Sequence, residues 1–261
     1  MDKKICLITG ATSGLGKALT KKLAAKNYNL ILVSKSKNKL QSLSKLLNTK
    51  NIKYITADLT KIRNIKKNIN KIDKVDILIN NAGNFYFKKE KSKINRTMML
   101  NYFIPIFFIK KLILEKKNKK RRLVINVSSH SIKRSTIPIS KIEELEKYNG
   151  WQIYKFSKLL LCLLTNFLSK KNSNIDFYSF FPGRMRTSFG SENNILIKNI
   201  TKVYLKILGN NPDLIADKII KIIENRKQIE KTNFEKKILN NYNVKIQKEL
   251  YFKTIKILKK I

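Results

Sequence analysis

A tyrosine and a lysine, Tyr154 and Lys158, stand four residues apart inside an apolar run with helical character. Four residues make about one helical turn, so both side chains are expected on the same face of a helix. A free tyrosine keeps its proton until a pH of about 10, but a nearby ammonium favours the phenolate and lowers that pKa. Such a pair can donate and accept a proton near neutral pH. Chance spacing on a solvated helix face is the alternative in a chain this rich in lysine.

The elements that would position this pair indicate a parallel sheet. Apolar runs rich in β-branched residues alternate with helix-like segments, and strands are expected at 5–9, 30–34, 52–57, 75–80, 122–128 and 175–180. Strands that are apolar on both faces and joined through helices predict an α/β fold: a single doubly wound, Rossmann-type parallel sheet with helices on both faces. Ligands of such folds bind beyond the carboxyl ends of the strands. The residues that follow each strand are therefore the candidates for a binding site.

A glycine-rich turn follows the first expected strand. It contains Thr9, Gly10, Ala11, Thr12, Ser13, Gly14, Leu15 and Gly16, with helix-forming residues after it. Glycines at such a turn let the backbone approach a pyrophosphate at the positive end of the helix. The spacing differs from G-x-G-x-x-G, and a tight connection without a ligand is the alternative. The strand before the turn and the helix after it favour a dinucleotide site.

The second expected strand ends in Ser34 and Lys35, with Lys37 close behind. An acidic residue at this point would accept hydrogen bonds from the ribose of NAD, and none stands here. Cations suit the 2′-phosphate of NADP, whereas ordinary surface lysines are the alternative. The sequence predicts that NADP (NADPH) is preferred over NAD.

Polar and small residues follow the later strands as well. In chain order they are Asp58 and Leu59, then Asn81, Ala82 and Gly83, then Ser128 and Ser129, and finally Pro182, Gly183 and Thr187. Each could be an ordinary cap or turn residue. Asn101 lies in an apolar helix-like segment, where an unpaired amide would be costly, so a hydrogen bond within that helix is the alternative to a functional role.

In this order the motifs resemble those of the short-chain dehydrogenase/reductase family, over nearly the whole chain. The resemblance implies that the glycine-rich turn binds the pyrophosphate of the cofactor and that the residues after the third and fourth strands border its adenosine. It places the proline, glycine and threonine after the sixth strand beside the nicotinamide. The catalytic tetrad of the family falls on Asn101, Ser129, Tyr154 and Lys158.

The resemblance also implies a chemistry. Ser129 would hydrogen-bond the substrate oxygen, and Tyr154 would exchange a proton with it as the general acid/base. Lys158 would hold the nicotinamide ribose and lower the tyrosine pKa, while Asn101 would position a water linked to Lys158. The cofactor would carry the hydride. The expected activity is that of an NADP(H)-preferring carbonyl reductase or alcohol dehydrogenase, and a catalytically idle dinucleotide-binding regulatory protein is the alternative.

Weaker features resemble the retinol-dehydrogenase-like and WW-domain-oxidoreductase-like branch. They are the long segment before Tyr154, the Asn-Pro-Asp at 211–213 and the tail at 249–254. Ile104, however, stands where the pattern places glycine, and the hydrophobic anchor of many retinol dehydrogenases is missing from the start of the sequence. Retinoid specificity is therefore not expected. His130, the only histidine, is expected to have a surface or supporting role, because Tyr154 already supplies the proton.

Length and composition indicate one domain. The 261 residues contain no linker, so a single NAD(P)-binding domain is expected over 1–261, with a substrate lid or surface insertion at 188–208 and a C-terminal helical part at 209–261. The apolar runs at 103–114 and 159–168 are too short to span a membrane, so no transmembrane anchor and a cytoplasmic location are expected. Two cysteines and one histidine argue against disulfides and a metal site.

The net charge of +40, from 57 basic and 17 acidic residues, raises the question of a nucleic-acid partner. Lysine is spread over nearly every segment together with asparagine and isoleucine, as is typical of AT-rich coding sequences, so no specific nucleic-acid binding is expected. The expected partner is a hydrophobic small-molecule carbonyl or alcohol. The apolar run at 159–164 favours a homodimer, with cover by the C-terminal helices as the alternative.

Overall fold

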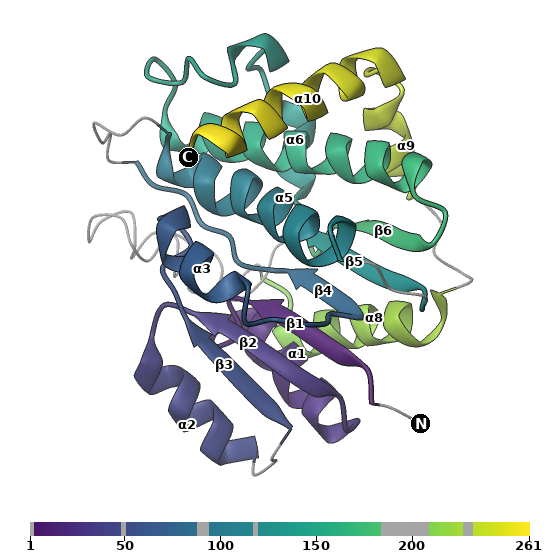
Figure 1. Cartoon of the computed structure of the whole chain (residues 1–261). Helices are drawn as coiled ribbons and strands as arrows, with labels where there is room; N and C mark the ends of the chain where they lie inside the picture. Colours follow the sequence, from purple (N-terminus) through teal and green to yellow (C-terminus); the bar gives the residue numbers. More distant parts are fainter. Residues whose placement is uncertain (1–2, 48–50, 88–93, 117–119, 184–208, 227–231) are drawn as a thin grey trace.

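A computed structural model of the protein describes residues 3–47, 51–87, 94–116, 120–183, 209–226 and 232–261. Six parallel strands in these residues form one sheet in the order β3-β2-β1-β4-β5-β6 (Figure 1). They are β1 (Ile5–Thr9), β2 (Asn29–Ser34), β3 (Ile52–Thr56), β4 (Ile77–Asn80), β5 (Arg122–Val127) and β6 (Ile175–Phe180). The strand order reverses between β1 and β4, which is where such folds bind ligands. The predicted doubly wound parallel sheet is confirmed.

Helices cover both faces of the sheet and enclose two hydrophobic cores (Figure 1). One face carries α1 (Gly14–Ala25), α2 (Lys37–Leu47) and α8 (Pro212–Glu224). The other face carries α3 (Ile62–Ile69), a long helix from Arg96 to Leu114, and α6 (Gly150–Lys171). Strands buried by helices on both sides need apolar side chains in both directions, which explains their nearly continuous hydrophobic sequence.

The long helix between β4 and β5 is not regular. It consists of α4 (Arg96–Met98), a π-helical segment η1 (Met99–Phe103), α5 (Ile104–Phe108) and a second π-helical segment η2 (Ile109–Leu114). Its 19 residues make it the one described helix long and apolar enough to cross a membrane, and 83% of its most apolar stretch of 18 residues is buried inside the protein. The helix is longer than the apolar run at 103–114. It begins at Arg96, directly after Asn95, whose side chain caps it.

The helix α6 is buried on nearly all sides between Ile153 and Leu168. One side faces the sheet, and α10 (Val244–Lys260) packs along another (Figure 1). Asn166 of α6 donates to Gln247 of α10 at 2.8 Å in this contact. The side of α6 away from the sheet was expected to be covered either by a second copy of the chain or by the C-terminal helices. The structure shows cover by a C-terminal helix, and a homodimer stays a prediction.

The C-terminal part contains a further helix, α9 (Asn233–Leu239), between α8 and α10. The expected lid at 188–208 and Thr187 lie outside the described residues. The assignment of 1–261 to a single domain therefore stays a prediction.

Candidate active site

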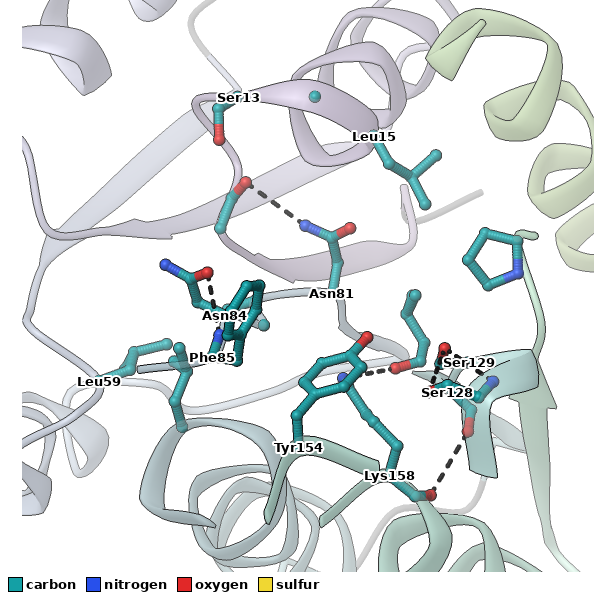
Figure 2. A pocket seen from close by; sticks show the side chains of 18 of the residues that line it. Ser13, Leu15, Leu59, Asn81, Asn84, Phe85, Ser128, Ser129, Tyr154 and Lys158 are labelled. Atoms are coloured by element: carbon teal, nitrogen blue, oxygen red, sulfur yellow. Dashed lines mark hydrogen bonds between the residues drawn. The ribbon is translucent and has the colours of Figure 1, made fainter. Parts of the chain in front are cut away.

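A cavity of about 1250 Å³ lies at the carboxyl ends of the strands, and residues that follow all six strands line it. A pocket for one small ligand usually measures about 300 to 1,000 Å³. The cavity therefore has room for a dinucleotide together with a second small molecule. Figure 2 shows it from close by, with the glycine-rich turn on one side and the residues after β5 on the other.

The glycine-rich turn is shaped by close backbone contacts. Gly10 has a φ of +67°, in the left-handed region that favours glycine. A Cβ atom on Gly16 would overlap the carbonyl oxygen of Gly10 and lie 2.7 Å from the Asn81 Nδ2. The turn can therefore fold against α1 only without side chains at these positions. Its cavity-lining members are Gly10, Thr12, Ser13, Gly14 and Leu15, next to the positive N-terminus of α1.

Thr9 and Asn81 tie this turn to the segment after β4. The Thr9 Oγ1 accepts hydrogen bonds from the backbone N–H groups of Asn81 and Ala82, each at 3.0 Å. The Asn81 side chain donates to the Thr9 carbonyl at 2.9 Å. Asn81, Ala82 and Gly83 line the cavity, whereas Thr9 and Gly16 do not. The latter two support the turn from behind.

The end of β2 offers hydroxyl groups and cations to the cavity. The Thr12 and Ser34 hydroxyls are 2.8 Å apart. Lys35 and Lys39 line the cavity, whereas Lys37 does not, because it lies on another side of the first turn of α2. The second cation of a phosphate site would therefore be Lys39, which the spacing in the sequence did not single out.

Asp58 lies further along the same end of the cavity, and it is the one acidic residue among the described lining residues. Its carboxylate accepts hydrogen bonds from the backbone N–H of Thr60 at 2.9 Å and from the Thr60 hydroxyl at 2.7 Å. Its neighbour Leu59 also lines the cavity. These bonds fix the orientation of the carboxylate at the carboxyl end of β3.

Ser129, Tyr154 and Lys158 meet in the cavity opposite the glycine-rich turn (Figure 2). Burial raises the pKa of Tyr154 to about 12, although a hydrogen bond with the Ser129 side chain acts in the opposite direction. The Lys158 Nζ donates to the Val127 carbonyl at 2.8 Å. Burial lowers the pKa of Lys158 to about 7. The phenol is therefore held as a neutral proton donor by the groups of the chain alone.

The expected lowering of the tyrosine pKa by Lys158 is not what these groups produce. Tyr154 is 7% and Lys158 3% exposed, so removal from water dominates and disfavours the charged form of both. Spacing in the sequence gave no information about the depth of burial. A lowered tyrosine pKa would need additional positive charge beside the phenol.

Asn101 lies behind the cavity, in η1, and does not line it. Its amide donates to the carbonyl of Asn84 at 2.9 Å and to the Ser157 hydroxyl at 3.2 Å, and its oxygen accepts from the N–H of Asn84 at 3.1 Å. A Cβ atom on Gly83 would lie 3.1 Å from both the Asn101 Oδ1 and the Lys158 Nζ. The amide thus joins the segment after β4 to α6 rather than bonding within its own helix, which was the alternative, and a water linked to Lys158 stays a prediction.

The first turn of α6 is fixed by a capping box. The side chains of Asn149 and Gln152 each accept the other residue's backbone N–H, at 2.9 and 3.0 Å. A Cβ atom on Gly150 would overlap the carbonyl oxygen of Tyr86, so the helix start lies directly on the segment after β4. One turn further on, this arrangement sets the position of Tyr154.

The cavity is also lined by several aromatic residues that the order of the motifs did not identify. Phe85, Trp151, His130 and Phe234 all border it. The His130 ring lies 4.8 Å from that of Phe234, and burial lowers its pKa, which fits the expected supporting role. Three of the four lie next to a motif in the sequence, and this proximity could have identified them. Phe234 comes from the distant helix α9, so its position in the sequence gave no such signal.

Pro182 and Gly183 follow β6 and line the cavity, and Gly183 has a φ of +74°. Together with the glycine-rich turn and the Ser129, Tyr154 and Lys158 group, they define a dinucleotide-binding oxidoreductase site at the switch point of a Rossmann-type sheet.

Comparison with known proteins agrees with this class. The sequence profile of the family described as short chain dehydrogenase matches residues 4–195, which is most of the chain. The chain therefore belongs to the short-chain dehydrogenase/reductase family, and it is an NAD(P)-dependent oxidoreductase of the class that acts on CH–OH and C=O groups. The predicted family is confirmed.

Its relatives are distant. A fatty acyl-CoA reductase of Acinetobacter baylyi is 28% identical over 240 residues, which cover 85% of this chain and 74% of that protein. Retinol dehydrogenase 13 of Homo sapiens is 28% identical over 230 residues, covering 82% and 70%. An alcohol dehydrogenase from Thermococcus sibiricus, solved with 5-hydroxy-NADP, has a TM-score of 0.67 at 23% identity and covers 88% of this chain and 94% of that one. This last likeness shows the fold.

Proposed function

We propose that this protein is an NADP(H)-preferring oxidoreductase that interconverts a carbonyl and an alcohol, with Tyr154 as the general acid/base. The observation that carries the proposal is that the Ser129 and Tyr154 side chains line the same cavity as the glycine-rich turn, close enough for Ser129 to lower the pKa of Tyr154. Two hydroxyls side by side suit a substrate oxygen, because one can donate to it while the other transfers a proton.

Each residue of the site would have its own role in the reaction. Tyr154 would give its proton to the substrate oxygen during reduction and take one during oxidation, with Ser129 holding that oxygen in place. Lys158 would orient the ribose side of the site, since the Val127 carbonyl and the absence of a side chain on Gly83 fix its ammonium. A bound nicotinamide dinucleotide would supply the hydride and, when oxidised, the positive charge that lowers the tyrosine pKa.

The preference for NADP is supported by charge. Lys35 and Lys39 line the cavity at the end of β2, beside the paired Thr12 and Ser34 hydroxyls, and the residues of this strand end include no acid. A solved short-chain dehydrogenase from Sphingobium yanoikuyae, in complex with NADPH, shares the fold with a TM-score of 0.67 at 21% identity. We propose that Lys35 and Lys39 would hold the 2′-phosphate of the cofactor.

The proposed substrate is a small, moderately hydrophobic aldehyde, ketone or alcohol, and the proposed location is the cytoplasm. The relatives named for fatty acyl-CoA and retinol support an apolar substrate. A panel of carbonyl compounds, followed by NADPH absorbance beside NADH, tests substrate class and cofactor together. Fractionation of cells that produce the full chain tests the location.

The variant Tyr154→Phe tests the catalytic proposal. It removes the transferable proton while keeping the ring, so turnover should fall by about 100-fold or more with NADPH binding nearly unchanged. Tyr251→Phe is the matched control, because this tyrosine lies on α10 and outside the described cavity lining. Unchanged turnover in Tyr154→Phe would contradict the proposal. Tight NADPH binding without turnover on any panel member would favour the idle regulatory protein instead.

A further inference from the structure

The indole of Trp151 is stacked on the ring of Tyr154. The two ring centroids are 5.2 Å apart and the ring planes differ by 12°. Trp151 is the second residue of α6, so the stack joins positions three residues apart on one face of the helix. Trp151 is still 40% exposed, and it lines the cavity.

The surroundings hold this indole in place. The ring of Phe85 meets Trp151 edge to face at 5.6 Å and meets Tyr154 at 6.3 Å. Phe85 comes from the segment after β4, which the start of α6 contacts directly through Gly150. The capped helix start fixes the backbone at Trp151, and the Phe85 and Tyr154 rings contact its indole, so the indole gives the cavity a preformed apolar wall.

A second aromatic group lines the same cavity beside Ser129. His130 follows that serine directly, and its ring lies 5.6 Å from Phe181 and 4.8 Å from Phe234. His130 and Phe234 both border the cavity. A substrate oxygen held by Ser129 and Tyr154 would therefore have aromatic neighbours next to each of the two hydroxyls.

We propose that Trp151 determines substrate specificity by selecting carbonyl compounds with a planar aryl or conjugated group on the reacting carbon. The inference rests on the proposed function, because the oxygen bound by Ser129 and Tyr154 fixes where that group lies. A substituent on the same carbon would lie close to the phenol, where the stacked indole also lines the cavity. Planar π-systems gain more from offset or edge contacts with an indole than saturated rings of similar size do.

The test compares an aryl aldehyde with its saturated cyclohexyl counterpart in wild type, Trp151→Leu, Trp151→Phe and the control Phe252→Leu. Phe252 is an exposed aromatic residue on α10, outside the described cavity lining. The kcat/KM ratio of the aryl to the cyclohexyl substrate should fall roughly two- to tenfold in Trp151→Leu. It should be mostly kept in Trp151→Phe and unchanged in Phe252→Leu. An equal loss for both substrates, or no loss, would overturn the proposal, because the indole would then only support Tyr154 or play no part.

A binding measurement separates this inference from the proposed function. The two corresponding unreactive carboxamides are titrated by calorimetry into the protein saturated with NADPH. Wild type should prefer the aryl amide and Trp151→Leu should lose that preference, whether or not any aldehyde is turned over. The same affinity ratio in both proteins would overturn the inference. Absence of turnover with the preference intact would count against the proposed carbonyl chemistry alone.

Discussion

Lys158 is the residue whose chemistry depends most strongly on its surroundings. Its ammonium is buried against the Val127 carbonyl at the centre of the site, and its pKa falls from 10.5 to about 7. A lysine held this way can exchange protons near neutral pH, which a solvated lysine cannot. The low pKa also has a consequence for stability.

Between pH 7 and 10.5 the unfolded chain binds a proton at Lys158 that the folded chain does not. The free energy of unfolding should therefore rise with pH across this window. The stability gained from the neutral buried lysine is lost again as the pH falls toward 7. Lys158→Met removes the group, so its unfolding free energy should rise less over the same window. Urea titrations of both proteins near the two ends of the window measure the difference. Identical pH dependence would show that the lysine is not buried as described.

Lys39 and Lys37 form a matched pair for the cofactor proposal. Both are exposed lysines at the start of α2, but only Lys39 lines the cavity. Lys39→Gln should weaken NADPH binding relative to NADH by about tenfold, which is the lower end of what a hydrogen bond to a charged group contributes. Lys37→Gln should leave the ratio unchanged. The dissociation constants of NADPH and NADH measure this ratio for each variant. Equal effects of the two variants would mean that general positive charge, and not Lys39 in particular, favours NADPH.

The start of α6 carries the strongest constraint at the scale of a single element. Helix propensity alone favours alanine over glycine by about 1 kcal/mol. At Gly150, however, a Cβ atom would overlap the Tyr86 carbonyl oxygen, so the helix start or the segment after β4 must move. Packing and propensity therefore predict opposite signs for the same substitution.

We expect packing to dominate, so Gly150→Ala should destabilise the protein by about 1 to 3 kcal/mol. It should also lower kcat, because Trp151 and Tyr154 follow on the same helix. Urea unfolding and steady-state kinetics measure the two effects. A variant as stable and as active as wild type would mean that the two segments separate without cost.

Buried side-chain amides connect whole elements in ways that their sequence positions did not suggest. Asn101 bonds to residues 17 and 56 positions away, in the segment after β4 and in α6. In the centre of the sheet, Asn80 of β4 donates to Asn126 of β5, which donates to Thr165 of α6, each at 2.8 Å. Buried amides paired in this way fix the register of neighbouring elements.

At the scale of the whole molecule, α10 completes the core over α6. Its Leu250 is buried with α6 in the same hydrophobic core, whereas Val244 at its start is 46% exposed. Leu250→Ala should lower the free energy of unfolding by about 2 to 5 kcal/mol, and Val244→Ala should change it little. Equal effects of the two substitutions in urea titrations would contradict this role of α10.

The contact between α10 and α6 also limits which surface a homodimer could use. Because α10 already covers one side of α6, a homodimer would have to use a different surface from the one that the apolar run suggested. Light scattering of the full chain measures the oligomeric state, and α10 variants show whether this helix takes part in it.

The sequence by itself determined the strands, the glycine-rich turn and the order of the motifs. These features depend on residue type and on short periods along the chain: buried parallel strands need continuous apolar residues, and a phosphate turn needs glycine at fixed positions. Local chemistry was therefore enough to predict the sheet and to identify the family.

The tertiary structure alone decided how the site residues behave. It set the pKa directions of Tyr154 and Lys158, gave Asn101 its partners, brought Lys39 rather than Lys37 to the cavity and placed α10 over α6. The physical reason is the same in each case. Exposure to water and contacts between distant segments are properties of packing, and residue spacing along the chain does not contain them.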